Sequence, residues 1–138
     1  MRLPKCEVVT GSEEFKNIFL VTRSIRYDGQ DLMVDIQGES LIWIRITFRD
    51  PIGFRVLDER DLCEFWDSYS TRSGWLYEVF EGGWRELEMT RERLVSHSMV
   101  PDLKEFLLVD DKCINVLCAD SPTIESLGAD RANSARIQ

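Results

Sequence analysis

Strict alternation of apolar and polar residues after residue 41 is the feature that most constrains what this chain can fold into. The apolar positions are Ile42, Ile44, Ile46 and Phe48, and the residues between them are Trp43, Arg45 and Thr47. Successive side chains of a strand point to opposite faces, so this period of two predicts a β-strand with one apolar face. That face has to be buried, and the strand therefore belongs to a packed core.

A turn and a helix are predicted directly after this strand. Asp50-Pro51-Ile52-Gly53 places Asp, Pro and Gly where a type I turn prefers them, so Phe54 to Leu57 should run back beside the first strand. Asp58 is expected to cap the N-terminus of a helix that reaches Tyr69. Its apolar stripe would consist of Leu62, Phe65, Trp66 and Tyr69.

Further strands are predicted before this stretch. Cys6 to Val9 is a short candidate, and Ile18 to Tyr27 is a longer one that is rich in β-branched and aromatic residues. Asp28-Gly29 is a turn dipeptide that leads into the alternating run from Leu32 to Ile36. Because Gly38-Glu39-Ser40 supplies the next reversal, four consecutive segments are predicted to form an antiparallel meander.

A second hairpin is predicted around Gly82-Gly83, which joins the alternating runs Trp75 to Glu81 and Trp84 to Met89. Its core face would carry Leu76, Phe80, Leu87 and Met89, with Glu78 and Arg85 as a diagonal ion pair. Its opposite face would carry Trp75, Tyr77, Val79 and Trp84 among the acids Glu81, Glu86 and Glu88.

The remaining chain predicts one more hairpin and a tail. A brief helix can begin after Thr90. Phe106 to Val109 and Cys113 to Cys118 are near-continuous apolar runs, which is typical of central strands covered on both faces. The pattern then fades, and residues 128–138 are expected to be a flexible C-terminal tail.

These signals together predict a single globular domain over residues 1–127. The fold class is α+β, mainly an antiparallel β-sheet of about six to nine strands with meander and hairpin connections and one or two short helices.

The net charge of −8 limits the classes of partner. Nucleic-acid binding depends on clustered Lys and Arg that neutralise phosphates, so a nucleic-acid partner is not expected. The acid excess is greatest in residues 31–81, which contain eleven Asp or Glu and five Arg, a net charge of −6. Two interpretations remain open: a charge that merely maintains solubility, or an acidic face that steers a basic protein partner.

No apolar run approaches the ~20 residues that span a bilayer, and no signal-peptide pattern is present, so a cytoplasmic protein without a membrane partner is expected. Four cysteines are expected to be reduced and mostly buried, without a structural disulfide. They are Cys6, Cys63, Cys113 and Cys118.

The sequence assigns no catalytic residue, metal or cofactor. His97 is the single histidine, which excludes a histidine-based metal site and leaves one base for a cysteine nucleophile. The apolar surroundings of the cysteines would raise their pKa values and make them inert. Paired carboxylates such as Asp58 with Asp61 or Glu86 with Glu88 could act in hydrolysis, although capping and a solvated strand face explain them better.

The leading functional prediction is a non-enzymatic, acidic protein-binding domain, most concretely an immunity-type inhibitor of a basic protein such as a nuclease toxin. Large aromatic anchors next to charges are typical of binding hot spots. The candidate partner-binding residues are Trp75, Tyr77, Glu81, Trp84, Glu86 and Glu88. The alternatives are a small-molecule-binding or carboxylate-based hydrolytic domain, and a structural domain that forms a homodimer. If another element covers the aromatic face, its tryptophans belong to the core instead.

Overall fold

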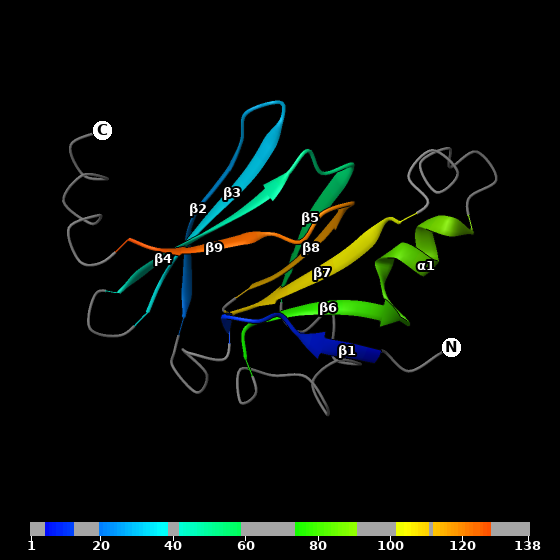
Figure 1. Cartoon of the computed structure of the whole chain (residues 1–138), viewed down its shortest axis with the longest axis horizontal. Coiled ribbons are helices and arrows are strands. Elements are labelled where there is room, and N and C mark those ends of the chain that lie inside the picture. Colours follow the sequence, from blue (N-terminus) through cyan, green and yellow to red (C-terminus); the bar gives the residue numbers. More distant parts are fainter. Residues whose placement is uncertain are drawn as a thin grey trace.

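The computed structural model describes residues 5–12, 20–38, 42–58, 74–90, 102–110 and 112–127. These residues form nine strands in two antiparallel sheets and one short helix (Figure 1). The α+β class with a mainly antiparallel sheet is therefore confirmed.

The five-stranded sheet has its strands in the order β1, β6, β7, β8, β5. Their bounds are Lys5–Val8, Leu76–Glu81, Lys104–Val109, Lys112–Cys118 and Gly53–Asp58. β7 is the middle strand and pairs with β8 in a hairpin in which Leu108 faces Ile114. The last predicted hairpin and its central position are both confirmed.

The four-stranded sheet has the order β2, β3, β4, β9. Their bounds are Val21–Tyr27, Asp31–Gln37, Trp43–Arg49 and Thr123–Ser126. β2, β3 and β4 form three segments of the predicted four-segment meander, with Val34 facing both Ile25 and Ile46. The adjoining strands β1 and β5 belong to the other sheet. β9 was not predicted, because only Ile124 is apolar in its four residues. Its position is set by pairing with β4 rather than by its own pattern.

The course of the chain after β4 differs from the prediction. Phe54 to Leu57 was expected to run back beside β4, but β5 pairs with β8 of the other sheet. Asp50, the first residue of the predicted turn, adopts a positive φ of 44°. β9 and β3 occupy the two edges of β4, so no edge is left for β5. The apolar pattern predicted the strand but not its partner.

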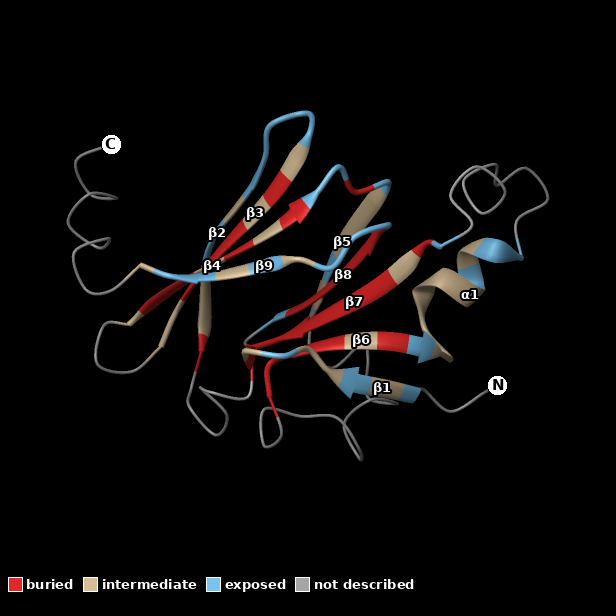
Figure 2. Ribbon diagram, viewed as in Figure 1, coloured by how far each residue is buried: buried red, intermediate tan, exposed pale blue. Residues whose placement is uncertain are grey.

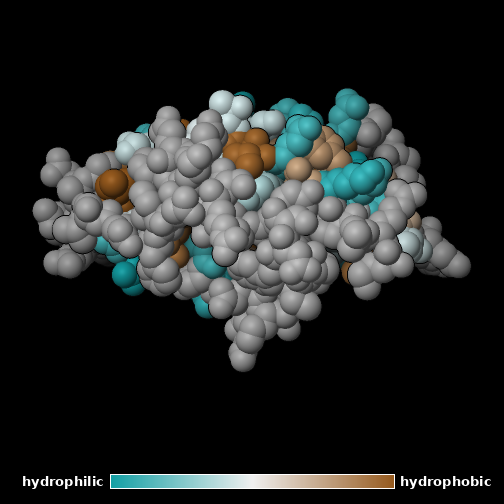
Figure 3. All heavy atoms as spheres, turned by 90° about the horizontal axis from the view of Figure 1, so that it is seen from below, coloured by the Kyte–Doolittle hydropathy of each residue, from teal (hydrophilic) through white to brown (hydrophobic). Residues whose placement is uncertain are grey.

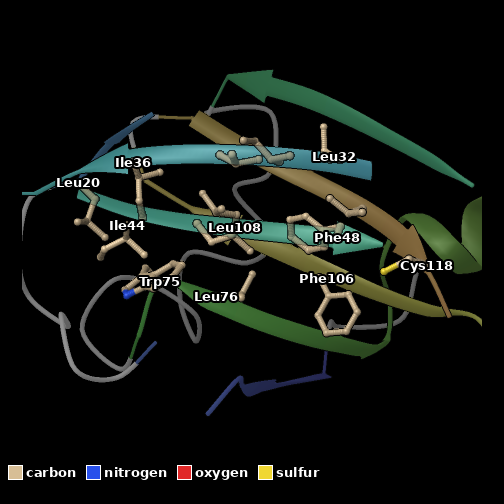
Figure 4. Packing of buried hydrophobic residues seen from close by; sticks show 14 residues of the cluster. Leu20, Leu32, Ile36, Ile44, Phe48, Trp75, Leu76, Phe106, Leu108 and Cys118 are labelled. Carbon is tan, nitrogen blue, oxygen red and sulfur yellow. The ribbon is translucent and has the colours of Figure 1, made fainter. Parts of the chain in front are cut away.

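The main core lies between the two sheets. β3 and β4 contribute Leu32, Val34, Ile36, Ile44, Ile46 and Phe48, all fully buried. The five-stranded sheet and the residue before β6 contribute Trp75, Leu76, Phe106, Leu108, Ile114, Val116 and Cys118. In Figure 4 the labelled side chains of the two layers point toward one another. The two apolar faces thus bury each other, as in a sandwich.

The other face of the five-stranded sheet is also buried. Tyr77, Val79, Leu107, Val109 and Cys113 form a second cluster there. Figure 2 shows the resulting burial along β7 and β8. Cys113 belongs to this cluster, whereas Cys118 belongs to the core between the sheets, so the two thiols lie on opposite faces as their spacing predicts. Burial on both faces explains the near-continuous apolar runs.

The prediction for residues 84–89 is wrong. They form helix α1 (Trp84–Met89) and not the return strand of a Gly-Gly hairpin. Both edges of β6 are already paired, with β1 on one side and β7 on the other, so no returning strand can be added. Three residues expected in the core are exposed as a result: Phe80, Leu87 and Met89.

Several predictions fall on residues outside the described ranges. The predicted helix from Asp58 to Tyr69 is one of them: Asp58 is described as the last residue of β5, and residues 59–69 lie outside the described ranges. The brief helix after Thr90 and the C-terminal tail also fall there, as do Cys63 and His97.

An ion pair marks the outer face of the four-stranded sheet. Asp35 of β3 and Arg45 of β4 are register partners, and the arginine Nε and Nη2 lie 2.8 and 3.0 Å from the two carboxylate oxygens. The hydrogen bonds that Arg45 donates to Asp35 raise the pKa of Arg45. A bidentate pair of this kind favours one register between β3 and β4.

Candidate functional site

A buried carboxylate fixes the N-terminus of α1. Glu105 of β7 is only 1% exposed and accepts hydrogen bonds from the backbone N–H groups of Trp84 (3.0 Å) and Arg85 (2.7 Å). The first N–H groups of a helix have no partner within the helix, and the residue at the cap position is Gly83, which has no side chain to accept them. Glu105 therefore caps α1 from another element.

Close approach of the backbone makes this cap feasible. A Cβ atom on Gly83 would lie 2.6 Å from both carboxylate oxygens of Glu105 and 2.7 Å from a methyl group of Val79. Real Cβ atoms do not come so close to other atoms, so any side chain here would push the carboxylate away. The preceding Gly82 has a positive φ of 75°, a conformation that glycine adopts readily. The two glycines thus reverse the chain and admit the carboxylate.

Opposing effects act on the ionisation of Glu105. Burial raises its pKa, because the charged form loses its hydration. Hydrogen bonds from Arg85, Trp84 and Asn115, together with the positive charge of Arg55, act in the other direction. Asn115 of β8 donates through Nδ2 at 3.0 Å, so the two carboxylate oxygens together receive three donors.

The same cluster holds the side chain of Trp84. The Arg55 guanidinium lies over the Trp84 ring at 5.1 Å, within the range of a cation–π interaction. Arg55 Nε also donates to Asn115 Oδ1 at 3.1 Å, and Trp84 Nε1 donates to Glu88 Oε1 at 2.9 Å. Residues of β5, β7 and β8 are thereby connected to α1 in one network.

Arg85 ties α1 to the backbone. Its Nη1 donates to the carbonyl of Leu103 (3.0 Å) and its Nη2 to the carbonyl of Phe80 (3.1 Å). The predicted diagonal pair with Glu78 is therefore wrong, since Arg85 lies on a helix and its guanidinium points at carbonyl groups. The loop before α1 is held as well, because the carboxylate of Glu86 accepts from the N–H of Gly82.

Helix α1 presents an exposed apolar group to solvent. Leu87 is 61% exposed, Phe80 43% and Met89 41%, and α1 contains no fully buried residue. Three acids stand beside them in the chain: Glu81, Glu86 and Glu88. We define these six residues as the α1 surface. Phe80 and Glu81 end β6, and the other four residues lie on the well-anchored helix α1. Together they form the strongest candidate site in the part of the chain that the structure describes.

The six candidate residues from the sequence do not share one strand face. Trp75 and Tyr77 are buried in different clusters, on opposite sides of the five-stranded sheet, because Trp75 precedes β6 and does not follow its alternation. Glu81 ends β6 and pairs with Lys5 at 3.4 Å. Trp84, Glu86 and Glu88 lie on α1. Their role in binding a partner stays a prediction.

Sequence reasoning missed the residues that anchor α1. Asn115 stands inside the predicted apolar run of β8, Glu105 directly precedes the run of β7, and Arg55 stands in β5. An amide within a run predicted to be buried requires a polar partner, so Asn115 carried a signal that Glu105 did not. The partner of Glu105, the backbone of residues 84 and 85, could not be found without the fold.

The described thiols and acids give no sign of a reactive centre. Burial raises the pKa values of Cys6 and Cys118 to about 12, so neither is a thiolate near neutral pH. Among the described residues, no group of three or more metal-binding side chains comes together, and no helix is long and apolar enough to cross a membrane.

In its described residues, this chain is a two-sheet antiparallel β protein whose helix α1 is fixed to the larger sheet by Glu105. Comparison with protein-family models, with curated proteins and with solved structures finds no match to this chain.

Proposed function

We propose that this protein is a non-enzymatic protein-binding domain whose α1 surface binds a basic protein. An immunity-type inhibitor of a basic toxin such as a nuclease is the concrete form of this proposal. The observation that carries it is the exposure of Leu87, Phe80 and Met89 around a helix that a buried carboxylate holds in place.

Anchoring of α1 supports a role in binding rather than in folding. α1 buries no residue fully, yet Glu105, Arg55 and Arg85 all contribute interactions that fix it. A side chain that is already ordered loses less entropy on binding than a mobile one. Exposed apolar groups on such a rigid support suit the centre of an interface, where water is excluded.

Charge gives the chemistry of the partner. The chain carries −8 overall, and Glu81, Glu86 and Glu88 stand next to the exposed apolar residues. Three described bases lie nearby, and each already has partners within the chain. Lys5 contacts Glu81, Arg55 contacts the Trp84 ring and Asn115, and Arg85 contacts backbone carbonyls. An acidic rim of this kind attracts a basic surface and accelerates association.

The contacts of Glu86 and Glu88 also favour binding over carboxylate catalysis. Glu86 accepts from the N–H of Gly82, and Glu88 accepts from the ring N–H of Trp84. Each carboxylate therefore has a structural role within its own segment. A catalytic pair would instead need to converge on a substrate.

The test begins with affinity capture from the native source and then measures binding of the captured protein to matched variants. Leu87→Ser removes the most exposed apolar group of α1, and Val56→Ser is its control because Val56 is an exposed apolar residue on β5. We expect Leu87→Ser to raise the dissociation rate about tenfold or more, equivalent to ~1.4 kcal/mol, and Val56→Ser to leave it unchanged.

Steering by charge is tested on the same complex. Glu81→Gln removes an acid that takes no part in the network around Glu105, and it should slow association at low ionic strength. Association of the wild-type protein should slow as salt is added, while dissociation changes little. A captured protein that binds Leu87→Ser as tightly as wild type, or that associates at a salt-independent rate, would contradict the proposal.

A further inference from the structure

Among the described strands, four form the edges of the two sheets, and three of these have features that discourage pairing with another chain. β1 and β9 are only four residues long, and β1 has a register shift next to Lys5. β2 has a register shift between Thr22 and Ser24 and carries exposed Arg23 and Arg26. Short length, irregular register and charge are the usual protections of a sheet edge.

β5 has none of these protections. It is six residues long, and its register with β8 runs without a shift from Gly53 opposite Leu117 to Asp58 opposite Lys112. The guanidinium of Arg55 is directed to the Trp84 ring and to Asn115, so this charge does not guard the edge. Val56, in the middle of the strand, is 40% exposed.

An apolar stripe accompanies this edge. Phe54 and Val56 alternate within β5 and so share one face, and Ile52 directly precedes the strand. Phe54 also packs against the core between the sheets. Tyr27, at the end of β2, places its ring 5.8 Å from that of Phe54. Tyr27 is 49% exposed and Ile52 42%. We call Tyr27, Ile52, Phe54 and Val56 the β5 surface.

The opposite side of the sandwich is closed by the chain itself. After β1, Val9 joins the core, and its N–H donates to the carbonyl of Leu76. A Cβ atom on Gly11 would lie 3.5 Å from the side chain of Ile124 in β9. Figure 3, which views the molecule from below, shows hydrophobic and hydrophilic residues side by side on the described surface there. On the side that carries β5 and β2, by contrast, three apolar residues are at least 40% exposed.

We propose that the β5 surface pairs with the same surface of a second copy of this chain. β5 would lie antiparallel to its counterpart across a two-fold axis, so that the two five-stranded sheets join into one continuous sheet. This interface is separate from the α1 surface and does not depend on the function proposed for it.

Local charge selects a second copy as the occupant. Exposed Arg26 and Arg49 lie in the chain next to exposed Asp28 and Asp50, at the turns that flank the β5 surface. The two turns are joined, because the carboxylate of Asp31 accepts from the N–H of Asp50. Under two-fold symmetry, the positive charges of such a surface can lie opposite the negative charges of its copy. A basic partner would instead require an acidic surface.

Analytical ultracentrifugation of the full chain at concentrations up to about 1 mM, the weak end of specific association, tests the pairing. We expect a monomer–dimer equilibrium for wild type and a monomer for Val56→Lys, since a charge at the middle of an edge strand blocks pairing. Leu87→Ser, the α1 variant, should dimerise like wild type.

Hydrogen exchange of backbone amides locates the contact if Val56→Lys fails to fold. In the wild-type protein, exchange in β5 should slow with rising concentration, while exchange in β2 and β9 should not. Ile52→Lys, at the end of the stripe, then serves as the second variant for ultracentrifugation. A wild-type protein that stays monomeric at all concentrations would overturn the proposal. So would a dimer that persists after either lysine substitution while the rate of amide exchange in β5 does not depend on protein concentration.

Discussion

Glu105 is the residue on which the geometry of α1 depends most. Its carboxylate sits in the central strand of the larger sheet and receives donors from Trp84, Arg85 and Asn115. A buried charge is costly unless hydrogen bonds replace its hydration, and here three of them do. The hydrogen bonds from Trp84 and Arg85 also fix the position of the helix N-terminus.

Replacing Glu105 with Gln should change how stability depends on pH. Burial raises the pKa of Glu105 above its ordinary value of 4.5, so between that value and the raised pKa the folded state binds more protons than the unfolded state. The contribution of Glu105 to the free energy of unfolding therefore falls as pH rises through this interval and is constant above it.

Denaturant unfolding of wild type and Glu105→Gln at a series of pH values checks this prediction. The free energy of unfolding of wild type minus that of the variant should decrease as pH rises through the interval. Using the difference cancels the other acids, which both proteins share. A difference that grows with pH would mean that the hydrogen bonds from Trp84 and Arg85 outweigh the effect of burial.

At the scale of elements, α1 is held by its attachments rather than by its own burial. A helix of six residues is too short to be stable alone in water, and this one buries no residue fully. Its stability therefore comes from the cap by Glu105, the bonds of Arg85 to two carbonyls and the contact of Trp84 with Arg55.

Gly83→Ala should disrupt this attachment. The new Cβ would lie 2.6 Å from the carboxylate of Glu105, so the cap would have to move, at a cost of about 1–3 kcal/mol in stability. Gly53→Ala is the matched control, because its Cβ would meet the Trp84 ring at 3.4 Å, close to ordinary contact. Denaturant unfolding compares the two. Equal effects would show that the approach of Glu105 to Gly83 is not what fixes α1.

At the scale of the whole molecule, one core connects the two sheets. Trp75, fully buried just before β6, belongs to the cluster that contains Ile36 and Ile44 from the facing sheet. A hydrogen bond also crosses the layers, since the hydroxyl of Thr22 in β2 donates to Asp110 after β7. The layers are therefore expected to unfold together.

Trp75→Ala should lower the free energy of unfolding by about 3–5 kcal/mol, as expected for truncation of a buried aromatic residue. The substitution removes the packing of the indole ring against the core between the sheets. Tyr27→Ala, which truncates a half-exposed ring, should cost about 1 kcal/mol or less. Thermal unfolding followed by fluorescence and circular dichroism gives both values. Separate transitions for the two probes would contradict a shared core.

The sequence by itself determined those features of the fold that depend on local periodicity. The alternation in Leu32 to Ile36 and in Ile42 to Phe48, with the turn at Asp28-Gly29, identified β2, β3 and β4 as a meander. The apolar runs of β7 and β8 identified strands covered on both faces. In each case the neighbours in sequence are also the neighbours in the sheet, so short-range pattern was sufficient.

Only the tertiary structure decided the partners of β5 and the state of residues 84–89. The pattern of Phe54 to Leu57 suits a strand beside β4 or beside β8, and the choice depended on which edges were already paired. Trp84 to Met89 alternates like a strand, yet it is helical because both edges of β6 are paired and Glu105 caps its N-terminus from 20 residues away. Competition for sheet edges and contacts between distant residues are long-range effects, and a local pattern does not contain them.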